Sequence, residues 1–191
     1  MSEIDAWLDA HAPRAESVGR APEPSEAPAP LSAALLPENA LIRVASGSPR
    51  DVIREFVAAV TYPETVDGAA LASRIYQREE LSSTATVDGV AFLHTPRWDA
   101  TPPIRSPLVA VGRLSRPVDF GAIDGTPTDL LFLLLAPDAR THLTLLAKAA
   151  RLCRDPGLVN GLRAAQSPHH VIDLIRASER AVFRSAPRAE H

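Results

Sequence analysis

Two histidines follow strongly apolar stretches, where a side chain can be presented at the edge of a sheet. His94 closes the run DGVAFLH, and His142 stands where the apolar run LLFLLLA gives way to a helical pattern. Ligands of open α/β sheets bind at strand ends, and a neutral imidazole is a nucleophile or a hydrogen-bond donor near pH 7. Each histidine also has an ordinary interpretation, His94 as a satisfied structural residue and His142 as a helix cap.

Two further polar pairs precede His94 and can assist a reaction at its ring. Arg78 and Glu79 end a predicted helix, and Ser83 and Thr84 begin the next predicted strand. A guanidinium offers a fork of N–H donors that suits a phosphate, and the two hydroxyls can orient the imidazole or bind an oxygen. The structural alternatives are a cation at a helix C-terminus for Arg78 and ordinary strand-start residues for Ser83 and Thr84.

Several other chemistries lack their sequence motifs. The nine glycines form no phosphate-binding loop, and no GxSxG nucleophile elbow is present. The only cysteine, Cys153, and dispersed histidines give no zinc pattern, so we expect no metal and no cofactor. His169 and His170 are adjacent at a helix start and point in different directions, which favours a structural or neutral role.

Composition limits the class of protein. The chain has 191 residues, 46% apolar and 23% charged, which is enough for one domain with its own core. A net charge of -3, with acids and bases interspersed, argues against nucleic acid as the main partner. A single cysteine suits a reducing compartment. With no signal peptide visible and no apolar run near the roughly 20 residues of a bilayer span, we expect a cytoplasmic protein without direct membrane insertion.

The pattern of predicted elements indicates an α/β domain. Residues 1–30 read as a short helix followed by a disordered Pro/Ala-rich linker, residues 31–185 as the folded domain and residues 186–191 as a tail. Strands are predicted over residues 40–44, 82–87, 90–95, 108–121 and 128–136, and helices from residues 49, 68, 138 or 141, 156 and 168. Ser48 is the predicted N-cap of the first of these helices and Ser167 that of the last. Together these elements predict a mixed, partly antiparallel sheet of about five strands flanked by helices.

The stretch REELSSTATVDGVAFLH, residues 78–94, resembles the active-site signature of a known family. This family is enzyme IIA of the phosphoenolpyruvate-dependent sugar phosphotransferase system, of the mannitol/fructose type that includes nitrogen-regulatory proteins. In the family, Arg-Glu ends a helix, Ser-Thr follows after three residues, and Gly-Ile-Ala-Ile-Pro-His ends in the histidine that is phosphorylated. Leu93 stands here where the family has proline. The resemblance extends over about residues 31–183.

The resemblance implies a phosphocarrier fold and assigns roles to individual residues. His94 falls on the phosphorylated histidine, His142 on the second active-site histidine and Arg78 on the active-site arginine. The implied donor is a histidine-containing phosphocarrier protein, and the implied acceptor is a IIB-type component or a regulatory target protein. Pro96 and Trp98, just beyond His94, are candidates for the rim of the docking face.

Two alternatives stay open at this stage. The first is a regulatory binding module on the same fold, in which phosphorylation only switches affinity for a partner. Residues 3–11, EIDAWLDAH, resemble the closing helix of excisionase-type DNA-binding domains, so a longer form can be fused to such a domain. The second is a domain that has lost phosphorylation, suggested by Leu93, because replacing proline restores a backbone N–H and frees φ next to His94.

Overall fold

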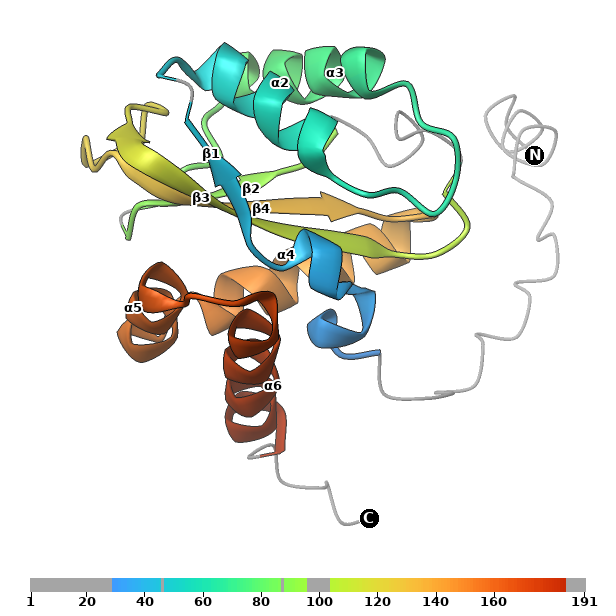
Figure 1. Ribbon diagram of the computed structural model, residues 1–191, viewed down its shortest axis with the longest axis vertical. Coiled ribbons are helices and arrows are strands. Elements are labelled where there is room, and N and C mark those ends of the chain that lie inside the picture. The colour runs from blue at the N-terminus through green and yellow to red at the C-terminus, as the bar shows by residue number, and fades with distance from the viewer. Residues whose placement is uncertain (1–28, 46, 87, 96–103, 185–191) are drawn as a thin grey trace, which may run out of the picture.

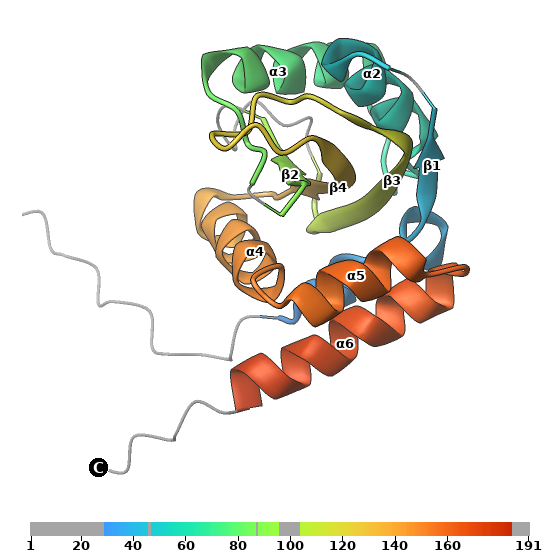
Figure 2. The same ribbon diagram turned by 90° about the vertical axis from the view of Figure 1, so that its left-hand side faces the viewer.

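One four-stranded sheet forms the middle layer of the protein, with helices on both of its faces (Figures 1 and 2). The computed structural model describes residues 29–45, 47–86, 88–95 and 104–184. Helices α2 (Pro49–Ala59) and α3 (Gly68–Leu81) cover one face. Helices α4 (Ala139–Leu152), α5 (Pro156–Ala164) and α6 (Pro168–Arg184) cover the other. Two short 3-10 helices, η1 (Leu31–Ala34) and η2 (Pro37–Asn39), precede the first strand.

The sheet is mixed, with the strand order β1-β3-β4-β2. Its strands are β1 (Ile42–Val44), β2 (Val90–Leu93), β3 (Leu108–Val118) and β4 (Thr128–Leu135). β1 is parallel to β3, β3 is antiparallel to β4, and β2 is parallel to β4. The prediction of an α/β domain with a mixed sheet is therefore confirmed, and the apolar run LLFLLLA is the central strand that was expected.

The number of strands differs from the prediction of about five. Residues 82–87, predicted as a strand, contribute only one isolated bridge, between Ala85 and Ala91. Around it, the Thr86 N–H donates to the Val90 carbonyl at 2.8 Å, and the Phe92 N–H donates to the Thr84 carbonyl at 3.4 Å. The segment thus pairs antiparallel with β2, but its ladder is too short to form a fifth strand.

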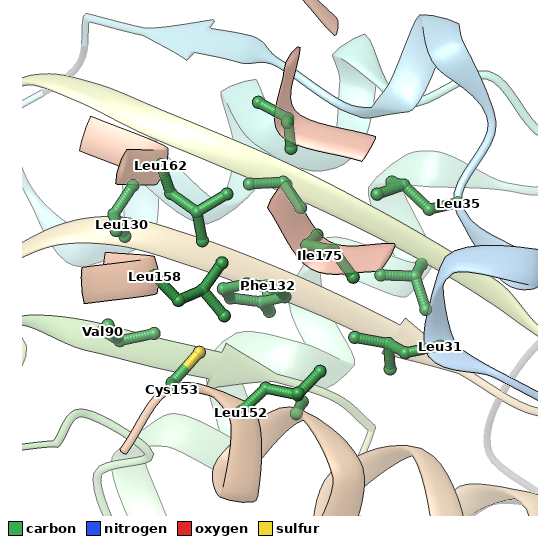
Figure 3. Close-up of a cluster of buried hydrophobic side chains, with 14 of the residues drawn as sticks. Leu31, Leu35, Val90, Leu130, Phe132, Leu152, Cys153, Leu158, Leu162 and Ile175 are labelled. Atoms are coloured by element: carbon green, nitrogen blue, oxygen red, sulfur yellow. The ribbon is translucent and has the colours of Figure 1, made fainter. Parts of the chain in front are cut away.

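Strand alternation divides the core between the two faces of the sheet. Leu130, Phe132 and Leu134 of β4 pack against α4, α5 and α6, whereas Leu131, Leu133 and Leu135 pack against α2 and α3. In β2, Val90 and Phe92 lie on the same side as Phe132 of β4. Figure 3 shows Val90 and Phe132 in one cluster with Leu152 of α4. His94 comes two residues after Phe92, so the same alternation places it on the side of the sheet where α4 begins.

Helix caps predicted from the sequence are present. The Ser48 hydroxyl accepts from the Asp51 N–H at 3.3 Å, and the Ser167 hydroxyl accepts from the His170 N–H at 3.2 Å. For α4, of the two candidates, Asp138 is the N-cap. Among the described residues, no helix combines the length and hydropathy that crossing a bilayer requires.

The turn that leads into β2 depends on a glycine. Gly89 has φ +71, and a Cβ there would lie 2.9 Å from Arg163 Nη2 and 3.0 Å from the Pro127 carbonyl oxygen. Arg163 cannot easily move away, because its guanidinium is paired with the Asp129 carboxylate at 2.8 Å and donates to the Asp88 carbonyl at 2.6 Å. The Asp88–Gly89 turn is thereby fixed to α5 and β4, and with it the start of the strand that ends at His94.

Candidate active site

His94 follows the last residue of β2 directly and is held by the strand's own backbone. Its Nδ1 lies 2.7 Å from the Phe92 carbonyl oxygen. A carbonyl can only accept, so Nδ1 carries the proton and Nε2 keeps the lone pair of the neutral ring. The side chain is 8% exposed, which is less open to water than the sequence suggested for an imidazole at a strand end.

His142 lies beside it, although the two residues are 48 positions apart in the chain. It occupies the first turn of α4, where the Asp138 carboxylate accepts the Thr141 N–H at 2.9 Å and the Thr141 hydroxyl at 2.7 Å. The ring centroids of His94 and His142 are 5.3 Å apart, and the ring planes are inclined by 57°. The fold thus brings together the two histidines that the sequence singled out.

Both rings favour the neutral form. Burial lowers the pKa of His94 from its ordinary 6.5, the hydrogen bond to Phe92 opposes this, and the charge of Arg78 lowers the pKa further. Burial also lowers the pKa of His142, and the neighbouring His94 adds to that effect. Near pH 7 the pair therefore offers an unprotonated nitrogen and N–H donors.

Arg78 contributes positive charge from the last turn of α3. Its Nη1 donates to the Ser82 carbonyl at 2.8 Å, which satisfies an orphan acceptor at the helix C-terminus. Its guanidinium is also near enough to His94 to lower the pKa of that imidazole. The contact with Ser82 matches the structural interpretation of Arg78, and its charge acts on His94, as the functional interpretation requires.

The hydroxyls of Ser83 and Thr84 do not point freely toward the histidines, because both donate to Glu79. Ser83 Oγ lies 3.0 Å from Glu79 Oε1, and Thr84 Oγ1 lies 2.7 Å from Glu79 Oε2. The Thr84 N–H also donates to Oε1, at 2.8 Å. Glu79 itself is 8% exposed, so this carboxylate is a buried acceptor of three hydrogen bonds.

Sequence reasoning placed Glu79 in the motif but gave it no role. A signal was present, since Glu79 continues the buried stripe of Leu71 and Ile75 at four-residue spacing on α3. A carboxylate on the buried face of a helix needs donors, and the Ser-Thr pair that follows supplies them.

The other residues considered in the sequence lie on α6 or outside the described residues. His169 and His170 are exposed on α6. Pro96 and Trp98, proposed for the docking rim, lie outside the described residues, as do the predicted tail and all but the last residues of the predicted linker. Within the described ranges, no three His, Cys, Asp or Glu side chains are grouped closely enough to hold a metal ion.

Large apolar side chains are exposed on three segments of the described chain. They are Leu81 at the end of α3, 79% exposed, Leu143 next to His142, 66% exposed, and Ile123 in the β3–β4 connection, 97% exposed. The β3–β4 connection approaches the Ser-Thr segment, since a Cβ at Gly121 would lie 3.9 Å from the Ser83 Cβ. We name Leu81, Ile123 and Leu143 the apolar rim.

This arrangement suits covalent transfer of an anionic group. Nε2 of a neutral His94 is a nucleophile, His142 can donate an N–H, and Arg78 supplies a positive charge. Such donors match a group that carries several negative oxygens, as a phosphoryl group does.

Comparison with known proteins gives a consistent result. Residues 35–178 match the family described as phosphoenolpyruvate-dependent sugar phosphotransferase system, EIIA 2. A nitrogen regulatory protein of Bradyrhizobium diazoefficiens is 32% identical over 148 residues, which cover 76% of this chain and 94% of that protein.

Solved structures show the same fold. The nitrogen regulatory protein IIA-Ntr of Neisseria meningitidis has a TM-score of 0.66 and 26% sequence identity, over 76% of this chain and 98% of that one. Enzyme IIAMTL of Escherichia coli, solved in complex with phosphorylated enzyme IIBMTL, has a TM-score of 0.63 and 15% identity, over 74% of this chain and 97% of that chain, and supports the fold alone.

Proposed function

Because this chain belongs to the EIIA 2 family of the phosphoenolpyruvate-dependent sugar phosphotransferase system, we propose that it is a phosphocarrier whose acceptor atom is Nε2 of His94. The observation that carries this assignment is the 2.7 Å contact between His94 Nδ1 and the Phe92 carbonyl oxygen. It fixes the proton on Nδ1 and leaves the lone pair on Nε2. The phosphorylated residue, the donor and the acceptor are all part of the proposal.

The transfer step involves one bond formed and one bond broken. The Nε2 lone pair attacks the phosphorus of a phosphohistidine on a small carrier protein, and the donor's P–N bond breaks with its electron pair returning to the donor ring. Nδ1–H donation to Phe92 stabilises the positive charge that the His94 ring gains. Arg78 and the N–H of His142 stabilise the charge on the transferred oxygens. Burial of His94 keeps the ring unprotonated before the attack.

Docking of a donor and an acceptor requires an accessible surface around His94. Of the apolar rim, Leu143 directly follows His142 in α4, and Leu81 lies two residues before Ser83. The buried core of a protein–protein interface is more apolar than the rest of the protein surface. Pro96 and Trp98, which lie outside the described residues, stay candidates for the same docking face.

A regulatory acceptor is the second candidate, and the relatives favour it. The protein that is 32% identical over most of both chains is named a nitrogen regulatory protein, as is the Neisseria structure. Transport in turn calls for a IIB-type acceptor, the kind of partner that enzyme IIAMTL has in its complex. In the regulatory version, the phosphoryl group on His94 changes affinity for a target protein instead of passing to a sugar.

Labelling tests whether His94 is the phosphorylated residue. The protein is incubated with phosphoenolpyruvate and the general components of a phosphotransferase system, and acid-labile label is measured. We expect label in the wild type and in His170→Ala, whose histidine is exposed on α6, but none in His94→Ala. Label that persists in His94→Ala, or no label in the wild type, contradicts the assignment.

A chase then distinguishes transport from regulation. Labelled protein is mixed with IIB-type components and sugars, and the label is followed to sugar phosphate. Transfer to a sugar supports the transport version. Label that stays on the protein while its affinity for a target changes supports the regulatory one.

A further inference from the structure

Hydrogen bonds to Thr84 and Phe92, linked through the backbones of these two residues, connect the buried Glu79 carboxylate to the imidazole of His94. Glu79 accepts from the Ser83 hydroxyl, the Thr84 N–H and the Thr84 hydroxyl at 3.0, 2.8 and 2.7 Å. Both oxygens of the carboxylate are therefore used to hold one short segment, the residues directly after α3.

That segment closes the outer edge of β2. β4 pairs with one edge of β2, and residues 84–86 pair with the other through two backbone hydrogen bonds. One of these runs from the Phe92 N–H to the Thr84 carbonyl. Both backbone polar groups of Phe92 are thus hydrogen-bonded: its N–H donates to the Thr84 carbonyl, and its carbonyl accepts from His94 Nδ1.

We propose that Glu79 is a positioning residue for phosphoryl transfer at His94. By fixing Thr84, the carboxylate sets the position of the Phe92 carbonyl, which in turn sets the tautomer and the orientation of the His94 ring. The inference rests on the proposed function, since it names a further residue for the same reaction. It also assigns Ser83 and Thr84 a different task from binding the phosphoryl group, because each hydroxyl proton is already donated to Glu79.

The chemistry calls for a carboxylate at this position. An ionised carboxylate accepts all three hydrogen bonds, whereas the amide of glutamine has one acceptor oxygen and an NH₂ group that only donates. Replacing Glu79 by Gln keeps the volume of the side chain but replaces one acceptor oxygen by an NH₂ group, so at least one hydroxyl has to turn from donor to acceptor. The adjacent Glu80 is exposed, so the same change there leaves the network intact and provides a matched control.

The test uses Glu79→Gln with Glu80→Gln as control, and Thr84→Val with Thr84→Ser. Two quantities are measured on the full chain, the initial rate of phosphorylation and the ¹⁵N chemical shifts of the His94 ring in the unphosphorylated protein. We expect a loss of about tenfold or more in the rate for Glu79→Gln, since small misplacements of reacting groups are costly. In the ¹⁵N spectrum, a second tautomer with the proton on Nε2 should appear.

The threonine pair removes and restores a single hydroxyl. Thr84→Val should show the same direction of change as Glu79→Gln, and Thr84→Ser should return both measurements to wild-type values. Wild-type rate and wild-type ¹⁵N shifts in a folded Glu79→Gln variant overturn the proposal, and if that variant does not fold, the same result in Thr84→Val does so. Unfolding of Thr84→Val also overturns it, because Thr84 would then serve folding and not the position of the ring.

The two hypotheses fail in different ways. Absence of label in the wild type rejects the proposed function but leaves the ¹⁵N measurement of the His94 tautomer unaffected. An unchanged tautomer in the variants, with label present in the wild type, rejects only the role of Glu79.

Discussion

At His94, the surroundings act on the two ring nitrogens in different ways. The Phe92 carbonyl fixes the proton on Nδ1, and burial disfavours a second proton on Nε2. Leu93, which replaces the proline of the family signature, does not prevent this arrangement. It lies in β2 with a fully buried side chain, and the next residue still reaches the carbonyl of Phe92. We therefore expect Leu93 to be compatible with phosphorylation.

Removal of the second histidine should slow the transfer without preventing it. In the proposed transfer step, His142→Ala lacks the ring that would donate to the transferred oxygens, while the proposed nucleophile His94 remains. The loss of one such donor lowers rates by about 10²-fold in comparable sites. The measurement is the initial labelling rate, with His170→Ala as the control. A rate equal to that of the wild type would show that His142 has only a structural role.

The shifts in histidine pKa predict a pH dependence of stability with a definite sign. Both folded-state pKa values are lowered from 6.5, so the unfolded chain binds protons more readily than the folded one. The stabilising contribution is thus complete above pH 6.5 and is lost as the pH falls through the folded values. We expect the thermal unfolding midpoint to fall more steeply below pH 6.5 in the wild type than in His94→Asn. Parallel curves for the two proteins would contradict this interpretation.

The sequence allowed the two histidines and Arg78 to be chosen, but not their contacts. Strand ends and helix starts follow from local patterns, so His94 and His142 could be placed at element boundaries. The ring contact between them depends on how α4 packs on the sheet, which no local pattern contains. For the same reason, two adjacent glutamates look alike in the sequence although Glu79 is buried and Glu80 is exposed.

Among the elements, β2 has the largest part in positioning the site. It is only four residues long, yet it is held at its start by the Asp88–Gly89 turn, along one edge by β4 and along the other by residues 84–86. The helices were predictable because their caps and apolar stripes are local signals, as at Ser48 and Pro49. The segment after α3 was not, because its alternation resembles a strand while its partners are mainly a carboxylate and two peptide groups.

Two glycines allow the turn before β2 to be tested. Gly89→Ala combines a strained positive φ with close contacts to Arg163 and Pro127, whereas Gly125→Ala has a similar φ of +73 and nothing within 4 Å of the added Cβ. We expect Gly125→Ala to lower the free energy of unfolding by about 1 kcal/mol and Gly89→Ala by about 3 kcal/mol. Denaturant unfolding measures both values. Equal losses would mean that the contact with Arg163 is absorbed without cost.

In two separate parts of the described molecule, a buried glutamate accepts several hydrogen bonds from one short segment of chain. Glu79 holds the segment before β2, and Glu179 of α6 accepts from the backbone N–H groups of Leu31 and Ser32 and from the Ser32 hydroxyl. One fixes the surroundings of the histidines, and the other fixes the point where the chain enters the domain. Both use a charged acceptor to satisfy several donors that secondary structure leaves unpaired.

If a donor protein docks on the apolar rim, a charge introduced there should weaken its binding. Leu143→Glu places a charge beside His142 on an exposed position, so folding should be little affected, while association with a donor protein loses apolar contact. We expect the KM for the phosphorylated donor to rise about tenfold, with the maximal labelling rate changed much less.

Leu36→Glu is the matched control, because Leu36 is also exposed, at 41%, but belongs to the segment between η1 and η2 and is not part of the apolar rim. Its KM should equal that of the wild type. A matching rise in both variants would assign the effect to the added charge in general, and no rise in Leu143→Glu would remove the rim from the docking surface. Since Leu81, Ile123 and Leu143 belong to three segments that are far apart in the sequence, a shared docking surface depends on the tertiary arrangement, which the sequence pattern alone does not contain.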